Sequence, residues 1–267
     1  IKPFSFKAKE NASYDQFEEK FTLSIKKRSK NVNYTPWVSL SSGCDSGLIA
    51  STMKEVGCNF ECYYVELEED LEVLSERVSI LSSYGTKCNK ILIDPLEKKF
   101  ILNELQEIAP EYFQESVNDE LFELYGYNDY RLMGAYIASS KICKIAYKNN
   151  QLIHLSGQGV DEIISDYYNK NSNSRRSVFK GSWPDPLYEW ANFSGGWNEY
   201  YISSSERIGG AYGIENRYPF LDYEVVQSFL DLPTKLKSGE YKAPLIKMLK
   251  KHQFPYHMMK YGFRGCY

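Results

Sequence analysis

A short apolar run at residues 37–40 leads directly into a turn of small residues at 41–46, and a run with the character of a helix follows at 48–53. A strand, a Ser/Gly turn and a helix N-terminus together are typical of an anion site. Small residues let backbone N–H groups approach phosphate oxygens, and the helix dipole favours negative charge. The turn lacks both GxxxxGK[ST] and GxGxxG, but it contains a carboxylate, Asp45. A carboxylate beside phosphates indicates that Mg²⁺ lies between them.

A second segment repeats this design. The apolar residues 152–155 lead into Ser-Gly-Gln-Gly-Val-Asp-Glu at 156–162. Both turns are expected at the carboxyl ends of parallel strands, where open α/β sheets bind ligands. Two such turns can face one nucleotide and supply one Mg²⁺ carboxylate each, Asp45 and Asp161. Either side chain could instead cap a helix, but the pairing of the two loops favours the metal role.

Further motifs follow in order along the chain. Residues 215–222 read Glu-Asn-Arg-Tyr-Pro-Phe-Leu-Asp, Lys242 precedes Ala-Pro-Leu, and Lys260 precedes Tyr-Gly-Phe. The first turn resembles the SGGxDS pyrophosphate loop of the ATP pyrophosphatases (PP-loop enzymes). Taken together, the motifs resemble the synthetase domain of the asparagine synthetase family, whose framework β-lactam synthetases and lasso-peptide cyclases share. The resemblance runs from about residue 14 to the C-terminus.

The resemblance implies a set of site residues. Lys260 aligns with the active-site lysine of the family and Lys242 with a second family lysine, so both are candidate catalytic residues together with Gln158. Arg131 and Glu162 are candidates for substrate binding, and Glu215, Arg217 and Asp222 for holding the C-terminal part against the cleft. The implied ATP and pyrophosphate site consists of Leu40, Ser41, Ser42, Gly43, Asp45, Ser46, Val65 and Gly157.

The sequence departs from the family pattern at four positions. Ser42 replaces the first glycine of the loop, and Ser165-Asp166 replaces a Gly-Gly pair. Gln158 stands where asparagine synthetases have Glu and β-lactam synthetases have Tyr. An amide orients groups but cannot take a proton at neutral pH. The base then lies elsewhere (Glu162 or His154), or the nucleophile arrives unprotonated, or turnover is weak. A His inside an apolar strand is more often a core residue.

Bulk properties limit the class of protein. The chain has 267 residues, 43% of them hydrophobic, with a net charge of −3 and six cysteines without metal-ligand spacing. We expect a cytoplasmic protein with free thiols that binds neither nucleic acid nor membrane. No apolar run approaches roughly 18 residues. The chain begins Ile-Lys-Pro, similar to the linker after the glutaminase domain of asparagine synthetases, and offers no N-terminal Cys nucleophile. We expect no glutaminase domain within it.

Periodicity predicts the fold. Phe17, Phe21 and Ile25 recur at helical spacing, and strands are expected at 35–40, 62–67, 90–94 and 152–155, with helices between them. This order predicts a doubly wound parallel α/β sheet, of the adenine nucleotide alpha hydrolase type that the resemblance implies. Residues 1–168 would form the ATP-binding core, 169–186 an exposed loop, and 187–267 a helical lobe of the same synthetase domain.

The predicted activity is that of a Mg²⁺- and ATP-dependent carbon–nitrogen ligase. It would convert a carboxylate to an acyl-adenylate with release of pyrophosphate, and then transfer ammonia or an amine. Aspartate is the family default, and the departures permit another acid. Ammonia would come from solution or from a separate glutaminase domain or subunit. Two alternatives are a PP-loop enzyme that modifies tRNA, which the acidic balance disfavours, and a degenerate nucleotide-binding partner that regulates an amidotransferase.

Overall fold

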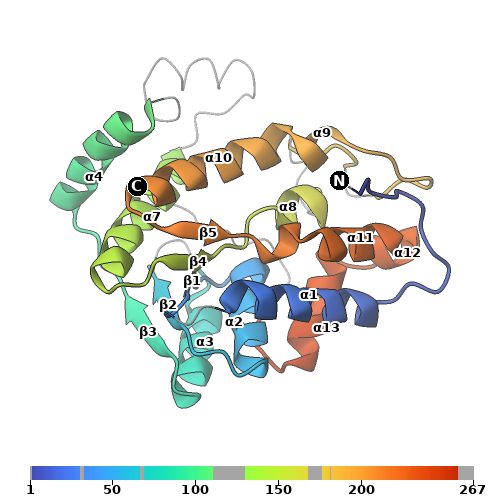
Figure 1. The fold of residues 1–267 in the computed structure, drawn as a ribbon, viewed down its shortest axis with the longest axis horizontal. Coiled ribbons are helices and arrows are strands. Elements are labelled where there is room, and N and C mark those ends of the chain that lie inside the picture. Colours follow the sequence, from blue (N-terminus) through green and yellow to red (C-terminus); the bar gives the residue numbers. More distant parts are fainter. Residues whose placement is uncertain are drawn as a thin grey trace.

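The computed structural model describes residues 2–30, 33–66, 69–110, 130–167, 176–180 and 182–257 (Figure 1). Arg131 lies in a described helix, but its side chain is outside the description, and Lys260 lies outside the described residues. The elements in chain order are α1 (Tyr14–Ser29), β1 (Trp37–Ser39), α2 (Cys44–Glu55), β2 (Glu61–Tyr64), α3 (Leu71–Ser83), β3 (Lys87–Lys90), α4 (Pro95–Ile108), α7 (Tyr130–Lys148), β4 (Ile153–Leu155), α8 (Val160–Ile163), α9 (Ala191–Ser194), α10 (Gly196–Ala211), β5 (Glu215–Arg217), η1 (Pro219–Leu221), α11 (Tyr223–Asp231), α12 (Thr234–Lys237) and α13 (Ala243–Lys251).

The five strands form one sheet in the order β3-β2-β1-β4-β5, and every neighbouring pair is parallel. The chain starts in the middle at β1, moves outward through β2 and β3, and then crosses to β4 and β5 on the other side. This topology confirms the predicted doubly wound α/β class. Because β1 and β4 are adjacent, the loops after them open side by side at the carboxyl edge of the sheet.

Helices cover both faces of the sheet, and alternate strand residues point to opposite faces (Figure 1). Val38 and Cys62 pack into a core with side chains from α1, α2, α3 and α13. Trp37 and Tyr63 point the other way, into a core with α7. A third apolar cluster joins α4, α7 and α10. The sheet is therefore buried on both sides, as a parallel sheet requires.

Local signals place most of the helices. The α1 side chains Phe17, Phe21 and Ile25 are fully buried, as their spacing predicts. The carboxylate of Asp70 accepts a hydrogen bond from the Val73 N–H at 3.1 Å and caps α3. Gly57 follows α2 with a φ of +67°, a conformation that glycine adopts without steric cost.

The third strand lies at Lys87–Lys90, so the prediction of 90–94 was wrong by three residues. The apolar run Ile91-Leu92-Ile93 suggested the later position. Pairing with β2 begins at Lys87, directly after the turn that ends α3, and Leu92 is left 72% exposed. At the edge of a sheet, hydrogen bonding to the neighbouring strand sets the register, and one face of the strand needs no apolar cover.

The segment expected as a helical lobe is mostly helical, but it also supplies β5 to the sheet. Part of the expected exposed loop is also buried, since Trp183 is only 6% exposed. Its ring packs edge-on against Phe229 and Trp190, with ring centroids 5.1 and 5.3 Å apart, respectively. An indole surrounded by aromatic rings removes a large apolar area from water. The C-terminal segment therefore shares one core with the preceding residues.

None of the helices in the described residues is long and apolar enough to cross a membrane.

Candidate functional site

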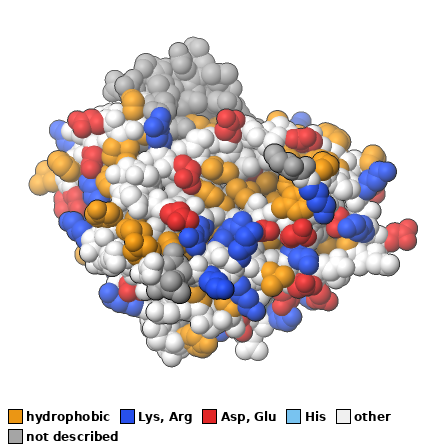
Figure 2. Space-filling view, viewed as in Figure 1, with side chains coloured by type: hydrophobic (Ala, Val, Ile, Leu, Met, Phe, Trp, Pro, Cys, Tyr) orange, Lys and Arg blue, Asp and Glu red, His pale blue; other side chains and the backbone are white. Residues whose placement is uncertain are grey.

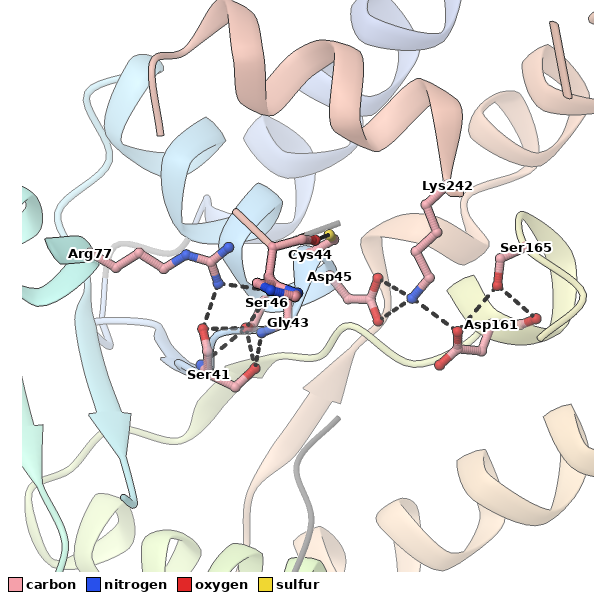
Figure 3. A network of polar contacts seen from close by, with 10 residues as sticks. Ser41, Gly43, Cys44, Asp45, Ser46, Arg77, Asp161, Ser165 and Lys242 are labelled. Carbon is pink, nitrogen blue, oxygen red and sulfur yellow. Dashed lines mark hydrogen bonds and ion pairs between the residues drawn. The ribbon is translucent and has the colours of Figure 1, made fainter. Parts of the chain in front are cut away.

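The loop after β1 is a compact turn closed by its own hydroxyl groups (Figure 3). The Ser41 and Ser46 hydroxyl oxygens lie 2.8 Å apart, and the Ser41 N–H donates to Ser46 Oγ at 3.1 Å. The Gly43 N–H donates to Ser41 Oγ at 3.2 Å, and Gly43 is the N-cap residue of α2. The predicted order of strand, small-residue turn and helix N-terminus is therefore present.

Ser42, where the family pattern has glycine, has its own partner. Its N–H donates to Glu69 Oε2 at 2.7 Å, and its hydroxyl donates to the same oxygen. The Asp70 N–H in turn donates to Ser42 Oγ at 3.2 Å. Burial raises the pKa of Glu69, although its bonds with Ser42 oppose the shift. The serine ties the loop to the residues that start α3.

The second loop packs closely against the first because its glycines leave room. A Cβ on Gly157 would lie 2.9 Å from the Cβ of Asp45. Gly159 has a φ of +89°, and a Cβ there would lie 2.3 Å from a methyl carbon of Leu221. α8 starts immediately afterwards at Val160, so Asp161 lies in its first turn. The glycines thus bring Asp161 close to Asp45.

Lys242 lies between these two carboxylates (Figure 3). Its Nζ is 2.7 Å from each carboxylate oxygen of Asp45 and 2.9 Å from Asp161 Oδ1. The Lys242 side chain is 2% exposed, and its backbone, at the N-cap of α13, has a φ of +48°. Burial alone would lower the pKa of Lys242, but Asp161 and Asp45 raise it well above its usual range. The lysine is therefore a charged ammonium that offsets one of the two negative charges of the pair.

The two carboxylates suit a hard cation. Asp45 and Asp161 both reach one positively charged atom, and Ser165 Oγ donates to Asp161 Oδ1 at 3.2 Å. Within the described ranges, no group of three or more His, Cys, Asp or Glu side chains could hold a metal ion. Mg²⁺ usually takes one or two carboxylates and completes its shell with phosphates and waters. The donor set fits Mg²⁺ bound together with a nucleotide.

Gln158 is oriented by α10. Its amide Nε2 donates to Ser205 Oγ at 2.7 Å, and its Oε1 is buried without a hydrogen-bond partner among the described residues. Glu162 is 3% exposed and accepts a hydrogen bond from the Tyr167 hydroxyl. Both residues follow β4; the Gln158 side chain contacts α10, and the Glu162 side chain contacts Tyr167.

His154 is a satisfied core residue. Its ring stacks on Trp37 with centroids 4.0 Å apart, Nδ1 lies 2.8 Å from Asn216 Oδ1, and Nε2 lies 3.3 Å from Ser39 Oγ. Burial lowers the pKa of His154 to about 4. With both nitrogens engaged, its geometry favours the core interpretation over a role as general base.

Leu40 and Val65 are buried in the apolar cores on opposite faces of the sheet. They follow β1 and β2, so their backbones lie at the carboxyl edge where the loops open. Cys44, inside the first loop, is also buried, and burial raises the pKa of its thiol to about 11. The thiol is therefore protonated at neutral pH and a weak nucleophile.

The side chains of Arg217 and Asp222 contact the end of α1, and the Arg217 carbonyl accepts a hydrogen bond from the Ser156 N–H of the second loop. Arg217 Nη1 donates to the Arg28 carbonyl at 2.6 Å, and Arg28 Nη1 lies 2.6 Å from Asp222 Oδ2. Figure 2 shows Lys and Arg side chains gathered over this end of α1 and β5. Glu215 pairs with Arg217 at 2.7 Å, and its side chain is 61% exposed. β5 is an edge strand, which leaves that side chain in solvent.

The sequence analysis missed Arg77 and Glu69. Arg77 is fully buried on α3 and donates to the carbonyls of Ser41 and Gly43 at 2.5 and 2.8 Å. A signal for it exists, because Leu74, Arg77 and Leu81 are spaced i, i+3, i+7 and place a charge on the apolar face of a helix. Glu69 has no such sequence signal.

Fold and loops define a doubly wound α/β protein with a candidate nucleotide site at the carboxyl edge of its sheet. Residues 192–260 match the sequence model of the family described as asparagine synthase. The chain is also similar to the glutamine-hydrolyzing asparagine synthetases of Gallus gallus and Bos taurus, each 24% identical over 208 residues. These similarities confirm the resemblance to the asparagine synthetase family that the motifs indicate.

The aligned region covers 74% of this chain and 32% of each relative, so the chain spans about a third of the length of the curated relatives it matches. Among solved structures, the NMN synthetase from Francisella tularensis is similar with a TM-score of 0.39 and 13% identity, covering 94% of this chain and 97% of that one.

Proposed function

We propose that the chain is an ATP-dependent carboxylate–amine ligase: it adenylates a carboxylate, releases pyrophosphate, and transfers ammonia or an amine to the acyl group. The observation that carries this proposal is the convergence of Asp45 and Asp161 on Lys242 from two neighbouring loops. The similarity to asparagine synthetases supports the same reaction class.

The first loop would hold the β- and γ-phosphates. Backbone N–H groups at the start of α2 and the hydroxyls of Ser41 and Ser46 are the available donors. Asp45 and Asp161 would hold Mg²⁺, which would neutralise phosphate charge and orient the pyrophosphate leaving group. The Lys242 ammonium would then donate to phosphate oxygens as well as to the carboxylates.

The first step is an attack on phosphorus. A carboxylate oxygen of the substrate forms a bond to the α-phosphorus, and the bond from that phosphorus to the bridging oxygen of pyrophosphate breaks. The second step is acyl transfer: ammonia or an amine attacks the carbonyl carbon, the nitrogen loses a proton, and AMP leaves with the acyl oxygen. Adenylation followed by acyl transfer replaces one difficult condensation by two easier steps. Lys242, and Lys260 as we propose from the motif, would stabilise negative charge during these transfers.

Gln158 would orient the incoming nitrogen rather than deprotonate it. Its amide oxygen is a buried acceptor, and the bond from Nε2 to Ser205 holds the amide in one orientation. An amide oxygen accepts an N–H but stays neutral. The amine is therefore expected to arrive as the free base, and amide formation should rise with pH as the ammonium loses its proton.

A regulatory nucleotide-binding role is the second candidate. The observation that favours it is the Ser42–Glu69 contact, in which a carboxylate occupies an N–H of the phosphate loop. Binding of ATP without cleavage would be the signature of that role.

Product analysis separates these functions. The chain would be incubated with Mg²⁺, ATP labelled at the α-phosphate, a panel of carboxylic acids including aspartate, and ammonia. We expect labelled AMP with one acid and a much lower amount with Asp161→Asn. Formation of ADP, or of no product while ATP remains bound, would contradict the ligase proposal.

A further inference from the structure

Arg77 is a buried cation that donates hydrogen bonds to three backbone carbonyls in two segments that are far apart in the sequence. Its Nη1 donates to the carbonyls of Ser41 at 2.5 Å and Gly43 at 2.8 Å, both in the first loop. Its Nε donates to the carbonyl of Pro255 at 2.8 Å, in the segment that precedes Lys260. Only a planar guanidinium offers donors at these fixed angles from one side chain.

The surroundings of Arg77 are shaped to hold it. A Cβ on Gly47, in the first turns of α2, would lie 2.5 Å from the Arg77 Cζ, so only glycine leaves room for the guanidinium. The ring of Phe254 lies under the same group, with its centroid 5.4 Å from Cζ. Burial lowers the pKa of Arg77 to about 10, which still leaves it charged at neutral pH.

The contacts of Arg77 determine which way the loop faces. In a trans peptide the C=O of one residue and the N–H of the next point in opposite directions. Because the Ser41 and Gly43 carbonyls point at Arg77, the N–H groups of Ser42 and Cys44 point away from it, and the Ser42 N–H donates to Glu69 Oε2. An anion loop needs its N–H groups on one side and its carbonyls on the other.

The same side chain connects the loop to the C-terminal segment. Besides the Arg77–Pro255 bond, the Cys44 thiol lies 3.7 Å from the His257 carbonyl. His257 Nε2 lies 3.9 Å from Asp70 Oδ2. Residues 254–257 thus lie along the first loop and the start of α3.

We propose that Arg77 is a positioning residue that holds the phosphate loop in its anion-binding form and docks residues 254–257 against that loop. This role rests on the proposed nucleotide site, because Arg77 acts on the phosphates only through the loop. Loss of Arg77 should release both segments together and weaken ATP binding.

The test compares Arg77→Met with Lys237→Met. Lys237 is a matched control, because it is also a buried cation and donates to the backbone carbonyls of Leu230 and Leu232, away from the loops. Hydrogen exchange of peptides covering 41–47 and 254–257 would be measured together with the dissociation constant of Mg²⁺·ATP. Both variants should melt at lower temperature. Only Arg77→Met should speed exchange in both segments, by at least tenfold, and raise the dissociation constant at least tenfold.

Two milder variants keep the test decisive if Arg77→Met does not fold. Arg77→Lys keeps the charge but loses the planar set of guanidinium donors. Its hydrogen-exchange rates in the two segments should lie between those of the wild type and Arg77→Met. Gly47→Ala keeps Arg77 but displaces its guanidinium, so its exchange rates and ATP affinity should resemble those of Arg77→Met. Gly210→Ala on α10, where the new Cβ meets open space, is the matched control and should behave like the wild type. Faster exchange in only one segment, or an ATP affinity within twofold of wild type, would overturn the proposal. Failure of the unmodified chain to bind ATP would refute the proposed function instead, and the exchange result would still decide whether Arg77 couples the segments.

Discussion

The Lys242 ammonium lies 2.7 Å from both carboxylate oxygens of Asp45, although the two residues are 197 positions apart in the chain. The contact joins the N-terminus of α13 to the N-terminus of α2, and the salt bridge to Asp161 adds the loop after β4. A cation held between two carboxylates is costly to bury unless both partners are present. The charge balance of the candidate site therefore depends on all three residues.

Lys242→Met should destabilise the protein and let Mg²⁺ bind the Asp45–Asp161 pair without a nucleotide. Without the ammonium, Asp45 and Asp161 face each other as two anions, and loss of one partner of a buried ion pair costs about 3–5 kcal/mol. Mg²⁺ at millimolar concentration should restore part of this loss by taking the place of the ammonium. Thermal melting with and without Mg²⁺ measures the effect.

Lys237→Met provides the control for this experiment, because Lys237 donates its hydrogen bonds to the backbone carbonyls of Leu230 and Leu232. Its melting temperature should fall and should not respond to Mg²⁺. An equal response of the two variants to Mg²⁺ would show that Asp45 and Asp161 do not form a cation site.

Gly157→Ala should impair nucleotide binding more than it lowers stability. The new Cβ would lie 2.9 Å from the Cβ of Asp45 and would push that carboxylate or separate the two loops. We expect the dissociation constant of Mg²⁺·ATP to rise about tenfold or more, which corresponds to about 1.4 kcal/mol. Gly210→Ala is the matched variant and should leave binding unchanged and stability equal or higher by up to about 1 kcal/mol. Equal ATP affinity in the two variants would contradict the close packing of the loops.

Asp222→Asn should affect stability without affecting ATP binding. Asp222 accepts hydrogen bonds from Arg28 and from the Glu224 N–H, and these contacts hold its pKa below the usual range although burial alone would raise it. Removal of the charge should cost about 1–3 kcal/mol in urea unfolding. In the wild type, the free energy of unfolding should fall as pH falls through the pKa of Asp222. The reason is that a carboxyl group with a lowered pKa stabilises the fold only while it is ionised. A change in ATP affinity of more than about twofold would mean that this group belongs to the site.

His154 should make the protein less stable in mild acid. Its pKa is lowered from 6.5 to about 4 in the fold, so between these values the unfolded chain binds a proton that the folded chain does not. The stabilising contribution is complete above pH 6.5 and is lost as pH falls towards 4, by about 3 kcal/mol for a shift of this size. His154→Gln should flatten the decrease in unfolding free energy over this range. Parallel pH profiles for the variant and the wild type would show that His154 titrates normally.

Gln158→Glu tests whether the amide at this position limits the second step. The Gln158 amide donates to Ser205 Oγ, whereas a carboxylate there would accept a hydrogen bond from the Ser205 hydroxyl and could also take a proton from the amine. We expect adenylation to stay within a few-fold of wild type, while amide formation accelerates at pH values where ammonium predominates. An unchanged ratio of the two rates would show that no base is needed here.

The sequence predicted the elements whose signals are local. Neighbouring residues are enough to predict the Ser41–Ser46 turn, the cap at Asp70 and the buried face of α1. The alternation of strands and helices also predicts that the first four strands run parallel. β3 was misplaced because Ile91 and Ile93 carry the apolar signal, whereas pairing with β2 decides where an edge strand begins. The burial of Trp183 was missed because Phe229, one of the rings that it packs against, lies in α11, far along the chain.

The site could be predicted only as a set of candidates. The repeated loop design predicts that Asp45 and Asp161 face one site, but their shared contact with Lys242 joins three segments that no local pattern connects. Arg217 belongs to a recognisable motif, yet its side chain bonds to Glu215 and to the Arg28 carbonyl at the end of α1. A motif identifies residues that matter to the fold and the site together, and only their contacts separate the two roles.

Carboxylate-dependent exchange of labelled pyrophosphate into ATP tests the central claim most directly. The purified chain would be assayed with Mg²⁺ against aspartate and a panel of other acids, without any amine, beside Asp45→Asn and Gly210→Ala. We predict exchange with one acid, retained in Gly210→Ala and reduced at least a hundredfold in Asp45→Asn, which would establish adenylation and identify the substrate. No exchange with any acid, while the chain still binds ATP, would contradict the ligase function and favour the regulatory nucleotide-binding role.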